Sequence, residues 1–171
     1  MTLSMYDISV PVYRQFLASL VGVLDKADAH CAANKLDPAI YMNARLVADM
    51  APFTFQVAQS ITHSIGALAQ IRGLQPVRVT GLDTFAAMKK ALADAIAQLD
   101  ALKPGDFDGC ENRTVELKFP GVEMKFTGLG YLQSFAMPQF FFHATTAYDI
   151  LRQAGVGIGK RDFLGKVQLA A

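Results

Sequence analysis

The sequence predicts an all-α protein, a four-helix bundle with one β-hairpin between the third and fourth helices. Apolar residues recur with helical spacing over four long segments. One short region instead alternates apolar and polar residues on both sides of a Pro-Gly pair, as the strands of a hairpin do. The 171 residues are 52% hydrophobic and 18% charged, which is typical of a folded chain with a sizeable core. We therefore expect one helical-bundle domain over residues 1–171.

The first helix is expected to begin at Ser9, a residue type that caps helix N-termini, with Pro11 in the first turn. There the missing N–H of proline is harmless. The helix should end near Asn34, because Asp37-Pro38 then marks a break. Its apolar face follows the i, i+3, i+4, i+7 rule through Tyr13, Phe16, Leu17, Leu20, Leu24 and Ala27.

The second and third helices follow the same spacing. The second should cover about residues 42–72 and stop at the glycine that follows. Pro52 lies inside it and is expected to kink the helix or delay its regular start. The third helix should begin after a cap at Asp83 or Thr84 and end at residues 103–105, a Lys-Pro-Gly sequence.

The hairpin is expected over residues 114–119 and 122–127, where the apolar period changes to two. A register that places Phe119 opposite Val122 also makes two charged pairs complementary, Lys118 with Glu123 and Glu116 with Lys125. An isolated hairpin is only marginally stable in water, so it should pack on the helices through one apolar face.

The last long helix should lie between about Leu129 and Ala154, with Pro138 splitting it into a short arm and a main body. The glycine-rich tail that follows is expected to be an irregular strap. Its anchors would be the apolar side chains Val156, Ile158, Phe163 and Leu164.

Composition excludes several function classes. The formal net charge is +1 and the sequence has no cluster of basic residues, so nucleic acid is not expected as a partner. No apolar run is long enough to span a membrane. Cys31 and Cys110 are too few for a disulfide framework, and the N-terminus has no secretory pattern, so we expect a cytoplasmic protein.

Three consecutive aromatic residues on the last helix favour a homodimer. The rings of Phe140, Phe141 and Phe142 point to nearly all sides of the helix, so at least one of them is expected to be covered by a second copy of the chain.

A narrow polar stripe runs along the predicted second helix. At about 100° per residue, Arg45 and His63 share one azimuth, and three further polar residues lie near it, Asp49, Gln56 and Gln59. The stripe has two interpretations, the solvated face of a peripheral helix or the lining of a polar groove between helices. Apolar residues on both sides of it keep the second interpretation open.

His143 is expected to point into the bundle. It shares its azimuth on the last helix with apolar residues, namely Ala136, Phe140, Ala147, Ile150 and Leu151. A histidine on an apolar face is commonly a hydrogen-bonded structural residue. The functional alternative is a metal ligand or a general base, since imidazole titrates near neutral pH.

The chain also resembles an uncharacterised DUF branch of the DinB/YfiT-like four-helix-bundle superfamily. Nearly the whole chain takes part in the resemblance. The residues that carry it are 5–11 (MYDISVP), 44–50 (ARLVADM) with Gln56, 142–152 (FHATTAYDILR) and 159–165 (GKRDFLG). The resemblance implies the bundle fold and says little about activity, because a shared fold does not define a shared function.

The resemblance also implies a possible metal. Members of the wider superfamily often hold a divalent ion with three histidines, one from the second helix and two at i and i+4 on the last. His63 and His143 match two of these positions. Position 147, where the third is expected, is alanine, and Asp149 faces the other side of the helix. By sequence, a site for Zn, Ni or Fe is therefore incomplete.

Three hypotheses follow. The leading one is a small-molecule-binding protein whose groove is built from Arg45, Asp49, Gln56, Gln59, His63 and His143. The second is a divalent-metal enzyme such as a low-molecular-weight thiol transferase, an activity that the resemblance implies for some relatives, with His63 and His143 as ligands. The third is a non-catalytic dimeric scaffold whose polar stripe is only solvated.

Overall fold

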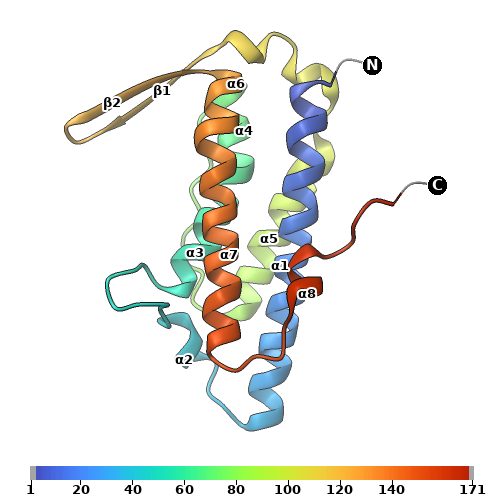
Figure 1. Cartoon of the computed structure of the whole chain (residues 1–171), viewed down its shortest axis with the longest axis vertical. Helices are drawn as coiled ribbons and strands as arrows, with labels where there is room; N and C mark the ends of the chain where they lie inside the picture. The colour runs from blue at the N-terminus through green and yellow to red at the C-terminus, as the bar shows by residue number, and fades with distance from the viewer. Residues whose placement is uncertain (1–2, 170–171) are drawn as a thin grey trace.

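Four long helical segments run side by side in the computed structural model, which describes residues 3–169 (Figure 1). The expected all-α bundle with one hairpin is therefore confirmed, while residues 1–2 and 170–171 of the expected domain lie outside the described residues. The segments are α1 (Met5–Asn34), α3–η1–α4 (Phe53–Ile61, Thr62–Gly66 and Ala67–Ile71), α5 (Phe85–Ala101) and α6–η4–α7 (Gly128–Tyr131, Leu132–Ala136 and Met137–Gln153). Both η1 and η4 are π-helical turns within longer helices.

Helix α1 begins earlier than the sequence predicted. Ser4, rather than Ser9, is the N-cap, and it forms a reciprocal capping box with Asp7 three residues on. Ser9 is buried inside the helix, where its hydroxyl donates to the Met5 carbonyl. Pro11 therefore lies within the helix and removes one backbone donor there. The predicted end at Asn34 is confirmed, since Lys35 takes a left-handed conformation.

The second helix begins at Phe53 and not near Met42. Pro52 has an extended backbone, so regular helix starts only after it, which is the delayed start that its ring favours. Before it lie the single turn α2 (Ala39–Met42) and an irregular stretch over residues 43–52. The helix then continues to Ile71 through η1.

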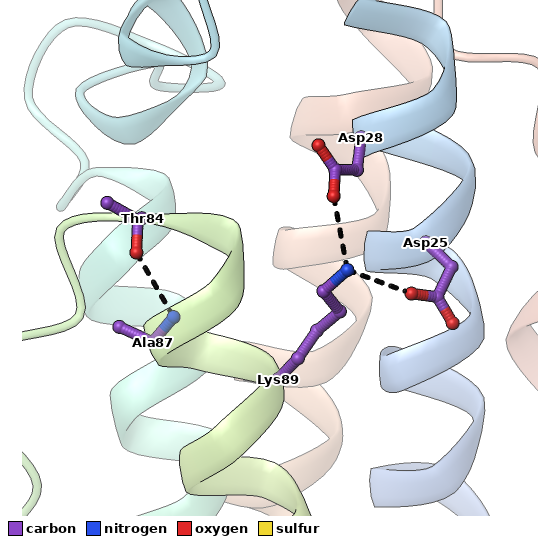
Figure 2. Close-up of polar contacts among 5 residues, drawn as sticks. All are labelled: Asp25, Asp28, Thr84, Ala87 and Lys89. Carbon is purple, nitrogen blue, oxygen red and sulfur yellow. Dashed lines mark hydrogen bonds and ion pairs between the residues drawn. The ribbon is translucent and has the colours of Figure 1, made fainter. Parts of the chain in front are cut away.

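Helix α5 is held at its start by the predicted cap, because the Thr84 hydroxyl accepts from the Ala87 amide. It packs along α1. Lys89 reaches across this contact and donates to Asp25 and Asp28 of α1 at 3.0 and 3.1 Å (Figure 2).

The hairpin has the predicted register. Strands β1 (Thr114–Phe119) and β2 (Val122–Thr127) pair antiparallel with Phe119 opposite Val122. Lys125 lies 2.8 Å from Glu116, and Lys118 lies 3.5 Å from Glu123. The hairpin projects sideways from one end of the bundle (Figure 1), and the short 3-10 turns η2 (Pro104–Phe107) and η3 (Cys110–Asn112) connect it to α5.

The root of the hairpin fits closely against α6. Val115 and Leu117 are buried, as the predicted apolar face requires. Gly128 packs directly under the Cys110 carbonyl, since a Cβ added there would lie 2.0 Å from that oxygen. Only glycine allows this approach.

The last long helix spans residues 128–153 without a break, close to the predicted 129–154. Pro138 does not split it. The backbone instead forms the π turn η4 immediately before Pro138, which redistributes the hydrogen bonds near a residue that lacks an N–H. In the tail, Val156 and Ile158 are buried as expected, and part of the strap forms a short helix against α1, α8 (Lys160–Leu164).

One apolar core connects all four segments, and its largest buried side chains include Tyr13, Phe53, Phe107, Tyr131 and Phe140. Of the three consecutive phenylalanines, Phe140 is buried and Phe142 is 54% exposed. Within residues 3–169, no helix combines the length and the apolar character needed to cross a membrane.

Candidate functional site

A cavity of about 610 Å³ opens between the second helical segment, the loop over residues 73–84, strand β1 and the last helical segment. Both π turns contribute to it, through Thr62 and His63 of η1 and Phe135 of η4. Insertions of this kind in α-helices often accompany functional sites. The remaining lining side chains are Phe55, Gln59, Gln70, Pro76, Arg78, Val79, Thr80, Glu116, Leu117, Lys118, Phe119, Tyr131, Gln139 and His143.

Two histidines from different segments meet in this cavity. The ring centroids of His63 and His143 are 5.5 Å apart, and the ring planes are inclined by only 7°. Aromatic edges enclose both rings. Phe135 lies 5.9 Å from His63, and Phe55 lies 5.9 Å from His143, each measured between centroids. The pair is therefore held by packing against Phe55 of α3 and Phe135 of the π turn η4.

Gln56 fixes the protonation pattern of His143. The side-chain nitrogen of Gln56 donates to the Ala51 carbonyl at 2.9 Å, which leaves Oε1 as the acceptor toward His143 Nδ1 at 2.7 Å. A carbonyl oxygen only accepts, so Nδ1 carries the hydrogen. In the neutral ring, Nε2 then has the free lone pair. Gln56 is buried behind the ring and does not line the cavity.

Both cavity histidines are neutral at physiological pH. Burial lowers the pKa of His63, and burial together with the nearby His63 lowers the pKa of His143 to about 4. Tyr131, whose hydroxyl donates to Gln70 Oε1 at 2.6 Å, also stays neutral, because burial raises its pKa to about 12. His63, His143 and Tyr131 therefore present uncharged hydrogen-bonding groups to the cavity.

The structure brings together four of the six residues predicted for the groove. Gln59, His63 and His143 line the cavity, and Gln56 supports His143 from behind. Arg45 and Asp49 are exposed in the irregular stretch before Pro52 and do not line it. The predicted stripe was wrong for these two, because it extended helical phase through a proline that delays the helix. The guanidinium of Arg45 instead donates to the Met50 carbonyl.

Several lining residues were not predicted. Arg78 and Thr80 come from the loop over residues 73–84, and Glu116 and Lys118 come from β1. The loop can approach because Gly66 of η1 has no side chain, and a Cβ there would lie 3.2 Å from the Val77 carbonyl. A glycine within an otherwise apolar helix was the available sequence signal for such a close backbone approach.

The donor set does not fit the metal that the fold family implies. Two imidazoles lie close together, and Gln56 accepts a hydrogen bond from the second ring nitrogen of His143. Metal-binding histidines commonly make a hydrogen bond of this kind. A catalytic zinc ion takes three protein ligands. Among residues 3–169, no group of three His, Cys, Asp or Glu side chains is placed to hold a metal ion. Ala147, at the position of the missing ligand, is buried in the core.

Comparisons with known proteins agree with this fold. A family model described as a domain of unknown function, DUF1993, matches residues 5–164. The chain is also similar to the crystal structure of a DinB family member protein from Shewanella denitrificans, with a TM-score of 0.87 and 29% sequence identity. That similarity covers 98% of this chain and 95% of the other. No curated protein matches the chain.

Proposed function

The chain belongs to the DUF1993 family of unknown function and has a DinB-like fold, and we propose that it binds a small molecule in the cavity beside His63 and His143. The observation that carries the proposal is that an uncharged imidazole, oriented by Gln56, lines this cavity. The cavity volume of about 610 Å³ lies within the range of small-molecule sites, which are commonly about 300–1,000 Å³.

The distribution of side chains supports a binding site over a solvated surface. Phe55, Phe135 and Leu117 provide apolar contact area, while Gln59, Gln139 and the two histidines provide hydrogen-bonding groups. Ligand sites commonly combine apolar walls with a few placed polar groups. The scaffold hypothesis needs a fully solvated polar stripe, whereas Gln59 and His63 are half-buried and Gln56 is buried.

We do not assign a metal-dependent activity, thiol transfer included, because two imidazoles are an incomplete ligand set. A cytoplasmic location is also part of the proposal. It is supported by Cys31 and Cys110, two buried cysteines that form no disulfide. The protein is also proposed to be a homodimer, because Phe142 presents an exposed ring.

The test is a fragment screen on the full chain. A library of neutral, acidic and basic fragments is screened by ligand-observed saturation-transfer NMR against the wild type and two variants. Gln139→Trp places an indole in the cavity from α7. Gln153→Trp makes the same exchange at an exposed position at the end of α7 and serves as the matched control.

We expect fragments that bind to both the wild type and Gln153→Trp and that lose binding to Gln139→Trp. Circular dichroism and thermal unfolding of each variant show whether it is folded. If no fragment depends on an open cavity in folded Gln139→Trp, small-molecule binding at this site is wrong.

A further inference from the structure

The charged side chains around the cavity differ in whether they are already paired within the protein. Glu116 lies 2.8 Å from Lys125 and 3.9 Å from Lys118, and Lys118 also lies 3.5 Å from Glu123. The strand charges therefore neutralise one another. Arg78 takes part in none of the ion pairs or side-chain hydrogen bonds among residues 3–169, although it lines the cavity. Its guanidinium is the uncompensated charge at this site.

The loop that carries Arg78 is held against the bundle. Its backbone at Val77 lies directly over Gly66, and the side chains of Pro76 and Val79 also line the cavity. Arg78 thus stands on a wall different from that of His143, which comes from α7. A guanidinium presents a planar fork of donors that matches a carboxylate.

The other wall offers a hydrogen-bond acceptor. Nδ1 of His143 is occupied by Gln56, and Nε2 has no protein partner among the described residues. Among the described residues, only the Tyr13 hydroxyl is a fully buried side-chain polar atom without a hydrogen-bond partner. Nε2 also has no partner but is not one of these fully buried atoms, so it is accessible from the cavity. Since His143 lines the cavity and Gln56 does not, Nε2 is the ring nitrogen that remains for a ligand. A neutral Nε2 accepts a hydrogen bond from an O–H or N–H group.

Building on the small-molecule function above, we propose that the ligand is a small organic carboxylate that also carries an O–H or N–H donor. Its carboxylate pairs with Arg78, and its donor binds Nε2 of His143. An apolar body joins the two groups and contacts Phe55, Phe135 and Val79. Gln56 acts as a positioning residue, because it holds the imidazole in the tautomer that accepts.

The test separates the charge from the donor by using matched probes. Three acids of increasing length are used: 4-hydroxybenzoate, 4-hydroxyphenylacetate and 3-(4-hydroxyphenyl)propionate. Each is compared with its primary amide, which removes the charge, and with its O-methyl ether, which removes the donor. Dissociation constants are measured by ligand-observed NMR at pH 7 and low salt, where the charge contribution is least screened.

For at least one length, we expect the acid to bind about tenfold or more tightly than either its amide or its ether, in line with hydrogen bonds to charged and buried groups. Arg78→Gln should remove the difference between acid and amide and keep that between phenol and ether. Arg152→Gln, an exposed arginine of α7 outside the cavity, is the matched control and should change neither. In 15N-histidine-labelled protein, the acid should shift Nε2 of His143, a measurement that requires no variant.

The outcomes distinguish the two proposals. If amides or ethers bind as tightly as the acids, or if none of these probes binds while cavity fragments do, the ligand class is wrong and small-molecule binding stands. If the acids bind equally to folded Gln139→Trp, their binding lies outside the cavity and this site is wrong for them. If no fragment depends on the open cavity either, the small-molecule function itself fails.

Discussion

Lowering the pH from 7 to 5 is expected to destabilise this protein through His143. The pKa of this ring is about 4 in the folded chain, against an ordinary value of 6.5, because burial and the neighbouring His63 disfavour its charged form. The unfolded chain therefore binds more protons than the folded chain between these two values. The stabilising contribution of the neutral ring is complete above pH 6.5 and is lost as the pH falls toward 4.

The magnitude follows from this shift. A pH of 5 is about 1.5 units below the ordinary pKa of 6.5, so the ring is largely protonated in the unfolded chain. In the folded chain the ring is still largely neutral at this pH. Each unit corresponds to about 1.36 kcal/mol, which gives an upper value of about 2 kcal/mol. The ring borders an open cavity, and solvent reduces the effect, so we expect about 1–2 kcal/mol from His143.

The assay is urea unfolding of the wild type and His143→Gln at pH 7 and pH 5. Gln cannot titrate, and its amide can still donate to Gln56 Oε1. Hydrogen bonds to Ser4 and Lys125 hold the pKa values of Asp7 and Glu116 below their ordinary range, so these carboxylates stay ionised at pH 5 and contribute little. The wild type should therefore lose about 1–2 kcal/mol more than the variant.

Equal losses in the two proteins would refute a neutral, buried His143. So would a wild type that becomes more stable at pH 5. A 15N titration of the labelled histidines provides an independent check, because His143 should remain neutral with hydrogen on Nδ1 well below pH 6.

Four further predictions concern stability, metal content and oligomeric state. Gln56→Leu should cost about 1–3 kcal/mol in urea unfolding, because it leaves His143 Nδ1–H without its buried acceptor; an unchanged midpoint would contradict this. Gly128→Ala should cost about 1–3 kcal/mol or more by the same assay, since the added methyl group meets the Cys110 carbonyl; wild-type stability would show that the hairpin root is not tight. Zinc measured by elemental analysis after gel filtration should stay well below one ion per chain, and one retained ion per chain would restore the metal hypothesis. Light scattering should give the mass of a homodimer that Phe142→Ser weakens, while a monomeric wild type would contradict the proposed dimer.

The sequence was most informative where the governing interactions are local. The hairpin register follows from alternation and from charge pairs a few residues apart, and the observed partners of Phe119 and Glu116 are the predicted ones. Thr84 caps α5 through an amide three residues away. The error at the first helix was also local. Ser4 and Asp7 form a capping box that Ser9 lacks, so the earlier serine begins the helix.

The site could be predicted only in part, because it depends on distances between segments. Helical phase places His143 on an inward face and His63 on a polar stripe, but it does not give their relative heights along the bundle. A π turn adds a residue to a helical turn and changes the phase beyond it, and η1 contains His63. Arg78 lies in a loop, where no periodicity applies. For Arg45, the phase was extended across Pro52, which delays the start of the helix.

The hydrogen-bonding groups of the cavity keep one protonation state because burial moves their pKa values away from neutrality. The amide of Gln56 binds His143, whose pKa is about 4, and the amide of Gln70 binds Tyr131, whose pKa is about 12. The pKa of His63 is lowered as well, and a guanidinium stays charged throughout. The site therefore presents one pattern of a cation, an acceptor and neutral donors across the physiological range. Under the proposed function, a change of affinity with pH near neutrality therefore reflects ionisation of the ligand, because the charges of these cavity groups stay constant.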